Sequence, residues 1–111
     1  MPAINTHMPA VSRHRDKCAT GHGCDRTAPV LSSQFQVHAE GKPILRKGDR
    51  VAPHVRKNPA PVPPGKPCIK HKANLTGGSR SVFVNGKPLG RYGDRADFGK
   101  MIRGANTVFA G

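Results

Sequence analysis

The sequence has few of the residues that build a large hydrophobic core. Its 111 residues include no tryptophan, one tyrosine and four phenylalanines, and Leu, Ile, Val and Phe together number only 21. A chain of this length forms at most one domain, and so few large apolar residues leave that domain a small core. We therefore expect a bound metal or a partner to contribute to its stability.

Long apolar runs are also missing. The sequence has no stretch of about 18 apolar residues that could span a membrane, and its first residues lack the charged and then apolar pattern of a signal peptide. Its three cysteines are an odd number, which argues against a closed disulfide framework and favours a reducing compartment or metal ligation. We expect the protein to be made in the cytoplasm.

Acidic residues are scarce as well. Six Asp and Glu against 19 Lys and Arg give a net charge of +13. So few carboxylates leave little material for acid–base catalysis, and we expect no enzymatic activity. Such a basic chain suggests a nucleic-acid partner. However, the cations are spread over nearly every segment, and five aromatic residues are too few for a base-stacking platform, so we do not favour nucleic acid.

The sequence does contain an internal repeat. Residues 82–95 match residues 37–50 position by position, with an offset of 45. A weaker copy begins at Met8, and residues 106–111 resemble the front half of the phrase. Three related units in about a hundred residues predict pseudo-threefold geometry. A chain of this kind can sit coaxially on a partner with threefold symmetry.

Within each clear copy the pattern is that of a β-hairpin. Glycine and proline are abundant, at 13 and 11 residues, which favours short strands and tight turns over helices. Asn85-Gly86 and Glu40-Gly41 lie between two short apolar segments and predict two-residue turns. At Gly48-Asp49 and Gly93-Asp94 we expect the carboxylate to accept backbone N–H groups and to pair with the arginine three residues earlier. The predicted fold class is therefore all-β.

The domain organisation follows from the repeat. Residues 1–7 precede the first unit and are assigned to an N-terminal arm. Residues 8–111 form the single domain. Residues 58–67 are rich in proline and predict a stiff, extended loop inserted in the second unit.

Candidate metal ligands follow the turn aspartates. His22 lies six residues after Asp16, and His54 lies five residues after Asp49, so a threefold arrangement would bring both to the same end of the molecule. Cys68 and His71 have the spacing of a chelating pair. These four residues would complete a tetrahedral structural zinc site with no open position.

Two alternatives remain open at this stage. Cys18 or Cys24 could replace His22 as the first ligand. A site made of Cys18, Cys24, Cys68 and His71 would instead resemble a zinc ribbon, which would indicate a small basic nucleic-acid-binding protein.

The motifs VFVNGKPLGRYGD, HAEGKPILRKGD, MPAVSRHRD and ANTVFAG together resemble the PAAR (proline-alanine-alanine-arginine) repeat proteins, which form spike tips in type VI secretion systems and contractile phage tails. The resemblance covers Met8 to Gly111. It implies a small cone of short antiparallel strands with pseudo-threefold repeats, whose apex is pinned by one zinc ion bound by three histidines and a cysteine. Here those ligands match His22, His54, His71 and Cys68.

The resemblance also implies partners and a destination. A PAAR-like tip caps a trimeric VgrG-like β-helical spike, with one tip per trimer, and touches the target membrane transiently. The chain ends at the terminal strand, so we expect any effector to be a separate protein. Such a tip is made in the cytoplasm and leaves it on the spike or in a virion tail. The chain departs from the pattern at Arg15, where the other units have glycine.

Overall fold

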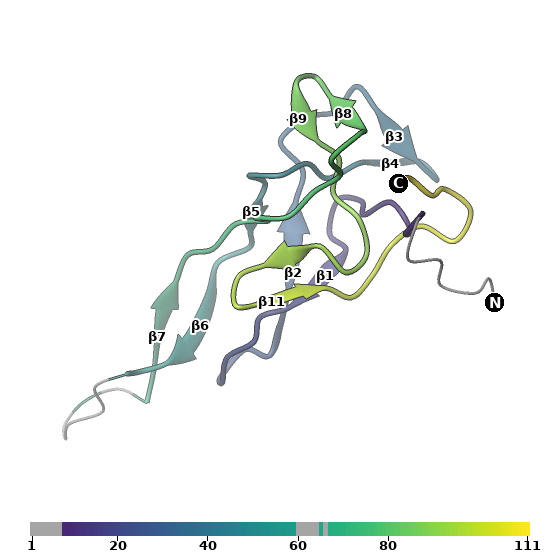
Figure 1. Cartoon of the computed structure of the whole chain (residues 1–111). Coiled ribbons are helices and arrows are strands. Elements are labelled where there is room, and N and C mark those ends of the chain that lie inside the picture. The colour runs from purple at the N-terminus through teal and green to yellow at the C-terminus, as the bar shows by residue number, and fades with distance from the viewer. Residues whose placement is uncertain (1–7, 60–64, 66) are drawn as a thin grey trace.

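The computed structural model describes residues 8–59, 65 and 67–111, and these residues form short β-strands joined by turns (Figure 1). Among them there is no helix long and apolar enough to cross a membrane. The predicted N-terminal arm, residues 1–7, and most of the proline-rich insert, 60–64 and 66, lie outside the described residues. The strands are β1 (Lys17–Ala19), β2 (Thr27–Leu31), β3 (His38–Ala39), β4 (Lys42–Pro43), β5 (Arg50–Val51), β6 (His54–Lys57), β7 (Cys68–His71), β8 (Phe83–Val84), β9 (Lys87–Pro88), β10 (Arg95–Ala96) and β11 (Gly99–Met101).

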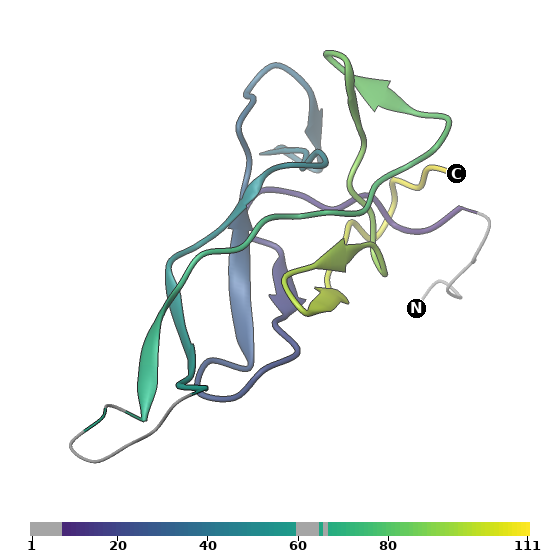
Figure 2. The same ribbon diagram turned by 60° about the vertical axis from the view of Figure 1, so that its left-hand side comes forward.

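The strands form one curved sheet and three separate hairpins. The sheet has the order β10-β11-β1-β2-β5, and the hairpins are β3-β4, β6-β7 and β8-β9. Every pairing is antiparallel. The molecule measures 48 × 28 × 24 Å, and the β6-β7 hairpin extends from the end opposite β3-β4 and β8-β9 (Figures 1 and 2). The predicted all-β, cone-like fold is confirmed.

The two predicted hairpin turns are present. Glu40 and Gly41 have φ angles of 52° and 79°, and Asn85 and Gly86 have φ angles of 49° and 81°. Positive φ at both central positions is the requirement of a type I′ turn, whose twist matches that of the flanking strands. Each turn therefore sets the register of a hairpin only two residue pairs long, β3-β4 and β8-β9.

Three backbone hydrogen bonds close the repeat units into a ring. The N–H of Ser12 donates to the carbonyl of Gly90 (3.0 Å), the N–H of Gly90 donates to Leu45 (2.8 Å), and the N–H of Leu45 donates back to Ser12 (2.9 Å). Each unit thus gives one bond to a neighbour and receives one from the other. This cyclic pattern is the predicted pseudo-threefold arrangement.

The first unit is assembled from both ends of the chain. In each unit a backbone N–H donates to the carbonyl of a neighbouring apolar segment, in the pairs Ile44–Val37 (3.0 Å), Leu89–Val82 (3.0 Å) and Val11–Val108 (2.9 Å). The segment ending in Val108-Phe109-Ala110 therefore occupies the place that residues 37–39 and 82–84 occupy in the other units. The carboxylate of Glu40 secures this segment by accepting the backbone N–H groups of Asn106 (3.0 Å) and Thr107 (3.0 Å).

The turn aspartates recur in all three units. Asp16, Asp49 and Asp94 each accept the backbone N–H of the residue three positions earlier, at 2.7, 2.8 and 2.8 Å. In the first unit Arg15 takes the left-handed conformation, with a φ of 71°, that glycine takes in the others.

The side-chain pairing predicted for the turns at Asp49 and Asp94 forms at Asp94 and not at Asp49, and the first unit has the same pairing at Asp16. Arg13 pairs with Asp16 and Arg91 pairs with Asp94, both at 3.1 Å. In the second unit the prediction is wrong, because the buried Arg46 guanidinium instead donates to Ser33 (2.9 Å), whose hydroxyl donates to Asp49.

The core is small and consists of two clusters. The cluster near the hairpin end contains Val11, Ile44 and Leu89, one from each unit, with Ala39, Val84 and Ala110. The cluster nearer β6-β7 contains Cys18, Ala28, Val30, Leu45, Val51, Leu75, Ala96 and Met101. Since each unit contributes only a few small side chains, hydrogen-bonded turns carry an unusual share of the stability.

We predict that Asp49→Ala lowers the free energy of unfolding by about 2–3 kcal/mol, because it leaves the buried Arg46 N–H and the Ser33 hydroxyl without their acceptor. Urea unfolding followed by circular dichroism measures the change. Lys47→Ala, at an exposed position of the same turn, serves as the control and should shift the free energy by less than about 0.5 kcal/mol. Equal shifts in the two variants would show that the Asp49 carboxylate does not contribute to the free energy of unfolding through these hydrogen bonds.

Candidate metal centre

Three imidazoles and one carboxylate converge where the β6-β7 hairpin faces the β10-β11 turn. One ligand atom from each of His22, His54, His71 and Asp97 lies within 4.8 Å of the others. The Asp97 carboxylate contacts all three imidazoles. One of its oxygens lies 2.9 Å from Nε2 of His22 and 2.7 Å from Nε2 of His54, and the other lies 2.8 Å from Nε2 of His71.

Neighbouring strands place two of the histidines. His54 begins β6 and His71 ends β7, and the two residues are directly opposite in the antiparallel register. Because directly paired residues project to the same face of a sheet, both imidazoles point to one side of the hairpin. His22 comes from the loop after β1, and Asp97 comes from the turn between β10 and β11, where its φ is 56°.

Two glycines allow the loop after β1 to reach the β10-β11 turn. A Cβ on Gly21 would lie 2.2 Å from the carbonyl oxygen of Phe98, and a Cβ on Gly99 would lie 2.0 Å from that of Ala19. Side chains at either position would push the segments apart. The contact is fixed by the Phe98 N–H, which donates to the carbonyl of Thr20 at 2.9 Å. The proximity of His22 to Asp97 therefore depends on this close approach of the two backbone segments.

The imidazoles of His22 and His54 are oriented by backbone carbonyls. Nδ1 of His22 lies 3.0 Å from the carbonyl of Gly23, and Nδ1 of His54 lies 2.8 Å from that of Ala52. A carbonyl only accepts hydrogen bonds, so Nδ1 carries the proton in both rings, and Nε2 is the nitrogen that faces the cluster. The two Nε2 atoms are 3.1 Å apart. Two ring nitrogens this close to one another and to a carboxylate require positive charge between them, either from protons on Nε2 or from a bound cation.

Burial alone would raise the pKa of the Asp97 carboxyl, but its contacts with His71, His22 and His54 outweigh that effect and lower the pKa. The Asp97 side chain is only 1% exposed. It is therefore a buried carboxylate that is charged at neutral pH, which is stable only when paired with positive charge.

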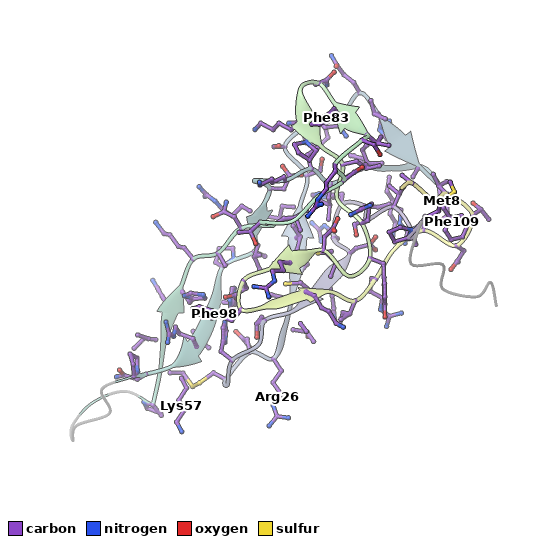
Figure 3. The ribbon with its side chains drawn as sticks, in the orientation of Figure 1. Met8, Arg26, Lys57, Phe83, Phe98 and Phe109 are labelled. Carbon is purple, nitrogen blue, oxygen red and sulfur yellow. A yellow bond between two sulfur atoms is a disulfide. The ribbon has the colours of Figure 1, made fainter. Side chains whose placement is uncertain are left out.

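An aromatic side chain covers one side of the cluster. The Phe98 ring stacks on that of His71, with centroids 5.7 Å apart and an interplanar angle of 15°. The Arg56 guanidinium lies over the Phe98 ring, 5.5 Å from its centroid. Figure 3 shows Phe98 beside the β6-β7 hairpin. This stack limits the access of water to His71.

The donor set fits a divalent metal ion. Ligand atoms about 2.0–2.1 Å from a tetrahedral zinc lie about 3.3 Å from one another. The contacts of Asp97 with the three histidines and of His22 with His54 measure 2.7–3.1 Å, and all four ligand atoms lie within 4.8 Å of one another, so their separations lie on either side of that spacing. Neutral imidazole and carboxylate are both ligands that zinc accepts, and four protein ligands would make a closed structural site.

The structure assembles three of the four predicted ligands and places the fourth elsewhere. His22, His54 and His71 meet, but the sulfur of Cys68 is bonded to Cys24. The reason is the strand that contains both Cys68 and His71. Residues three apart in a strand project to opposite faces, so the spacing that would chelate a metal in a loop cannot do so here. Asp97 is the fourth member of the cluster.

The other cysteine predictions are also corrected. The odd number of cysteines argued against a disulfide framework, yet Cys24 and Cys68 form a disulfide with a Cα–Cα distance of 6.1 Å. Cys18 remains a free thiol, fully buried in the core. Because Cys18, Cys24, Cys68 and His71 do not come together, the structure does not form the ribbon-like alternative.

Asp97 was not among the predicted ligands, although the sequence contains a signal for it. Asp97 follows the turn aspartate Asp94 by three residues, and at the same offset the other units have Ala19 and Ala52. Replacement of alanine by one of only six acidic residues, in the unit that lacked a histidine ligand, marks the position as unusual.

Comparison with known protein families agrees with the architecture. The model of the family described as the PAAR motif matches residues 20–103, a span that contains all four residues of the cluster. No curated protein matches the chain.

We predict that the purified protein binds about one zinc ion per chain and that Asp97→Asn weakens this binding by more than about 100-fold, since it removes the only anionic ligand. Elemental analysis after dialysis, with chelator competition, measures both quantities. His38→Ala changes an exposed histidine outside the cluster and should retain the metal. Full metal content in Asp97→Asn would exclude Asp97 as a ligand.

We predict that Cys18 does not react with alkylating reagents in the folded protein. Burial raises the pKa of its thiol to about 11, and the Asp97 charge adds to the increase. Because the folded pKa lies above the value of 9.0 for a free thiol, the stabilising effect of the protonated thiol is complete below pH 9 and is lost as the pH approaches 11. Mass spectrometry should detect modification of Cys18 at pH 8.5 only after unfolding, and rapid labelling of the native chain would contradict this.

Proposed function

The chain belongs to the PAAR-motif family, and on that basis we propose that it is a non-enzymatic tip protein that caps and sharpens a trimeric, VgrG-like β-helical spike. The family is associated with spike-tip proteins of contractile injection systems and is structural in character. The observation that carries the proposal is the ring of three repeat units, because it gives a single chain three similar faces about one axis.

The face proposed to dock on the spike is the hairpin end. Val37, Phe83 and Val108 are exposed there by 40%, 56% and 36%, and Phe35 is exposed by 69%. Val37, Val82 and Val108 are equivalent positions of the three units, because each accepts the corresponding backbone hydrogen bond. Figure 3 shows Phe83 and Phe109 at this end, away from Phe98. Exposed apolar side chains gathered at one end of a small protein are typical of an interaction surface.

Threefold pseudosymmetry explains how one chain would match three subunits. A homotrimer presents the same surface three times around its axis. Three related hairpin segments can each meet one subunit in a similar way, which gives a stoichiometry of one tip per trimer. Strand edges at the end of a β-helix are open to further pairing, and the tip would cover them.

The opposite end would need rigidity because it meets the target envelope first. Among the described residues, the second core cluster has only eight buried side chains, so apolar packing alone gives this end little stiffness. A zinc ion held by His22, His54, His71 and Asp97 would crosslink the loop after β1, the β6-β7 hairpin and the β10-β11 turn. Metal binding of this kind adds directly to folding free energy. Separate effector proteins and a transient membrane contact complete the proposed set of partners.

We predict that the protein forms a complex of one chain with one spike trimer and that Phe83→Asp weakens this complex by at least about tenfold, because it places a charge in an apolar contact. Sedimentation velocity with a purified trimeric VgrG-type spike measures the stoichiometry and affinity. Arg26→Asp, at an exposed position near the other end (Figure 3), is the control and should bind normally.

The alternative partner is tested in the same samples. Affinity for oligonucleotides that falls steeply with salt, without binding to the trimer, would replace the spike-tip proposal by nucleic-acid binding.

A further inference from the structure

We propose that Cys24 and Cys68 form a reversible thiol–disulfide pair that sets the metal affinity of the neighbouring centre. The inference rests on the metal centre of the proposed function. Its starting point is the position of the disulfide, which joins two segments 44 residues apart in sequence. Cys24 follows the ligand His22 by two residues, and Cys68 precedes the ligand His71 by three.

The disulfide acts on His22 through one carbonyl group. Nδ1 of His22 bonds to the carbonyl of Gly23 at 3.0 Å, and the same peptide unit continues into Cys24. The disulfide attaches this peptide unit to β7, the strand that also holds His71. It therefore fixes the orientation of the His22 ring relative to His71. Groups that orient metal-bound histidines in this way tune metal affinity.

The remaining contacts of this loop would keep it attached after reduction but would hold it less tightly. Asp25 and Val55 exchange two hydrogen bonds, from the Asp25 N–H to the Val55 carbonyl (3.1 Å) and from the Val55 N–H to the Asp25 carboxylate (2.9 Å). An isolated β-bridge also pairs Cys24 with Arg56, and the Thr20 hydroxyl donates to the Asp25 carbonyl at 2.6 Å. None of these contacts is covalent, so each can open without breaking a bond of the chain. Cys24 has a φ of 68°, a conformation that residues other than glycine rarely adopt, so it is expected to relax once the crosslink is removed.

The accessibility of the sulfurs suits a reversible reaction. Cys24 is exposed and Cys68 is half-buried, whereas Cys18 is fully buried. A soluble thiol can therefore reach the disulfide, and the third cysteine is not positioned to exchange with it. With oxidised glutathione as oxidant, the Cys24 and Cys68 thiols form one S–S bond while one glutathione disulfide is reduced to two glutathione thiols.

In the proposed function the protein moves from a reducing to an oxidising compartment. A tip assembled in the cytoplasm is kept under reducing conditions, and disulfides persist once a protein reaches an oxidising compartment such as a periplasm. The pair would then be reduced before firing and oxidised after delivery. Oxidation would tighten the metal centre at the stage when the tip has left the cell that made it.

The test is a zinc titration of the full-length protein in both redox states. Chelator competition measures the zinc affinity after anaerobic reduction and removal of the reductant, and again after reoxidation with oxidised glutathione. Alkylation after unfolding reports the state, because the oxidised chain has one free thiol, Cys18, and the reduced chain has three. We expect zinc affinity to fall by about tenfold or more on reduction and to return on reoxidation.

A variant separates the crosslink from other effects of the reductant. Cys24→Ser combined with Cys68→Ser should bind zinc with the affinity of the reduced wild type, and the same treatment should leave it unchanged. Equal or tighter binding by the reduced wild type would overturn the proposed redox control while leaving the metal centre and the spike-tip function in place. Absence of zinc binding in both redox states would overturn the metal centre and the redox control together.

Discussion

The structure depends on the cyclic closure of its three units. The hydrogen bonds that link Ser12, Leu45 and Gly90 form only when all three units are present, and one unit exists only when the N-terminal segment meets residues 106–111. Chain ends usually contribute little to a fold, whereas here they complete it. Cyclic closure adds stability to a protein that buries little apolar surface. Each unit takes part in two of the three hydrogen bonds, so no unit can detach without breaking both.

Closure also explains why the functional ends differ. At the hairpin end the three units keep the same backbone pattern, because Val37, Val82 and Val108 each accept the corresponding hydrogen bond. At the other end the units diverge. The first contributes a loop histidine, the second a hairpin with two histidines, and the third a turn aspartate, so three similar units supply four candidate ligands from different elements. In the proposed function, symmetry would serve docking at one end, and its loss would serve metal binding at the other.

The sequence predicts the parts of this molecule that depend on local chemistry. Asn85-Gly86 and the turn aspartates were predictable because positive φ and the capping of backbone N–H groups are properties of a few adjacent residues. The proximity of His22 and His54 was also predictable, because the two residues occupy near-equivalent positions in repeats that adopt similar structures. The ligand role of Cys68 could not be judged, because it depended on whether residues 68–71 form a loop or a strand, and strand pairing is set by distant residues. The roles of Asp97 and of the Cys24–Cys68 disulfide were unpredictable for the same reason, because each depends on contacts between residues far apart in the sequence.

The central claim is that one cooperative ring holds the fold together, and native-state hydrogen exchange measured by NMR tests it most directly. If the ring closes as described, the amides of Ser12, Leu45 and Gly90 exchange only through global unfolding and report the same free energy. If the Ser12 amide, in the unit made from the two chain ends, exchanges through local opening with a clearly lower free energy than the other two, closure is not what the structure depends on.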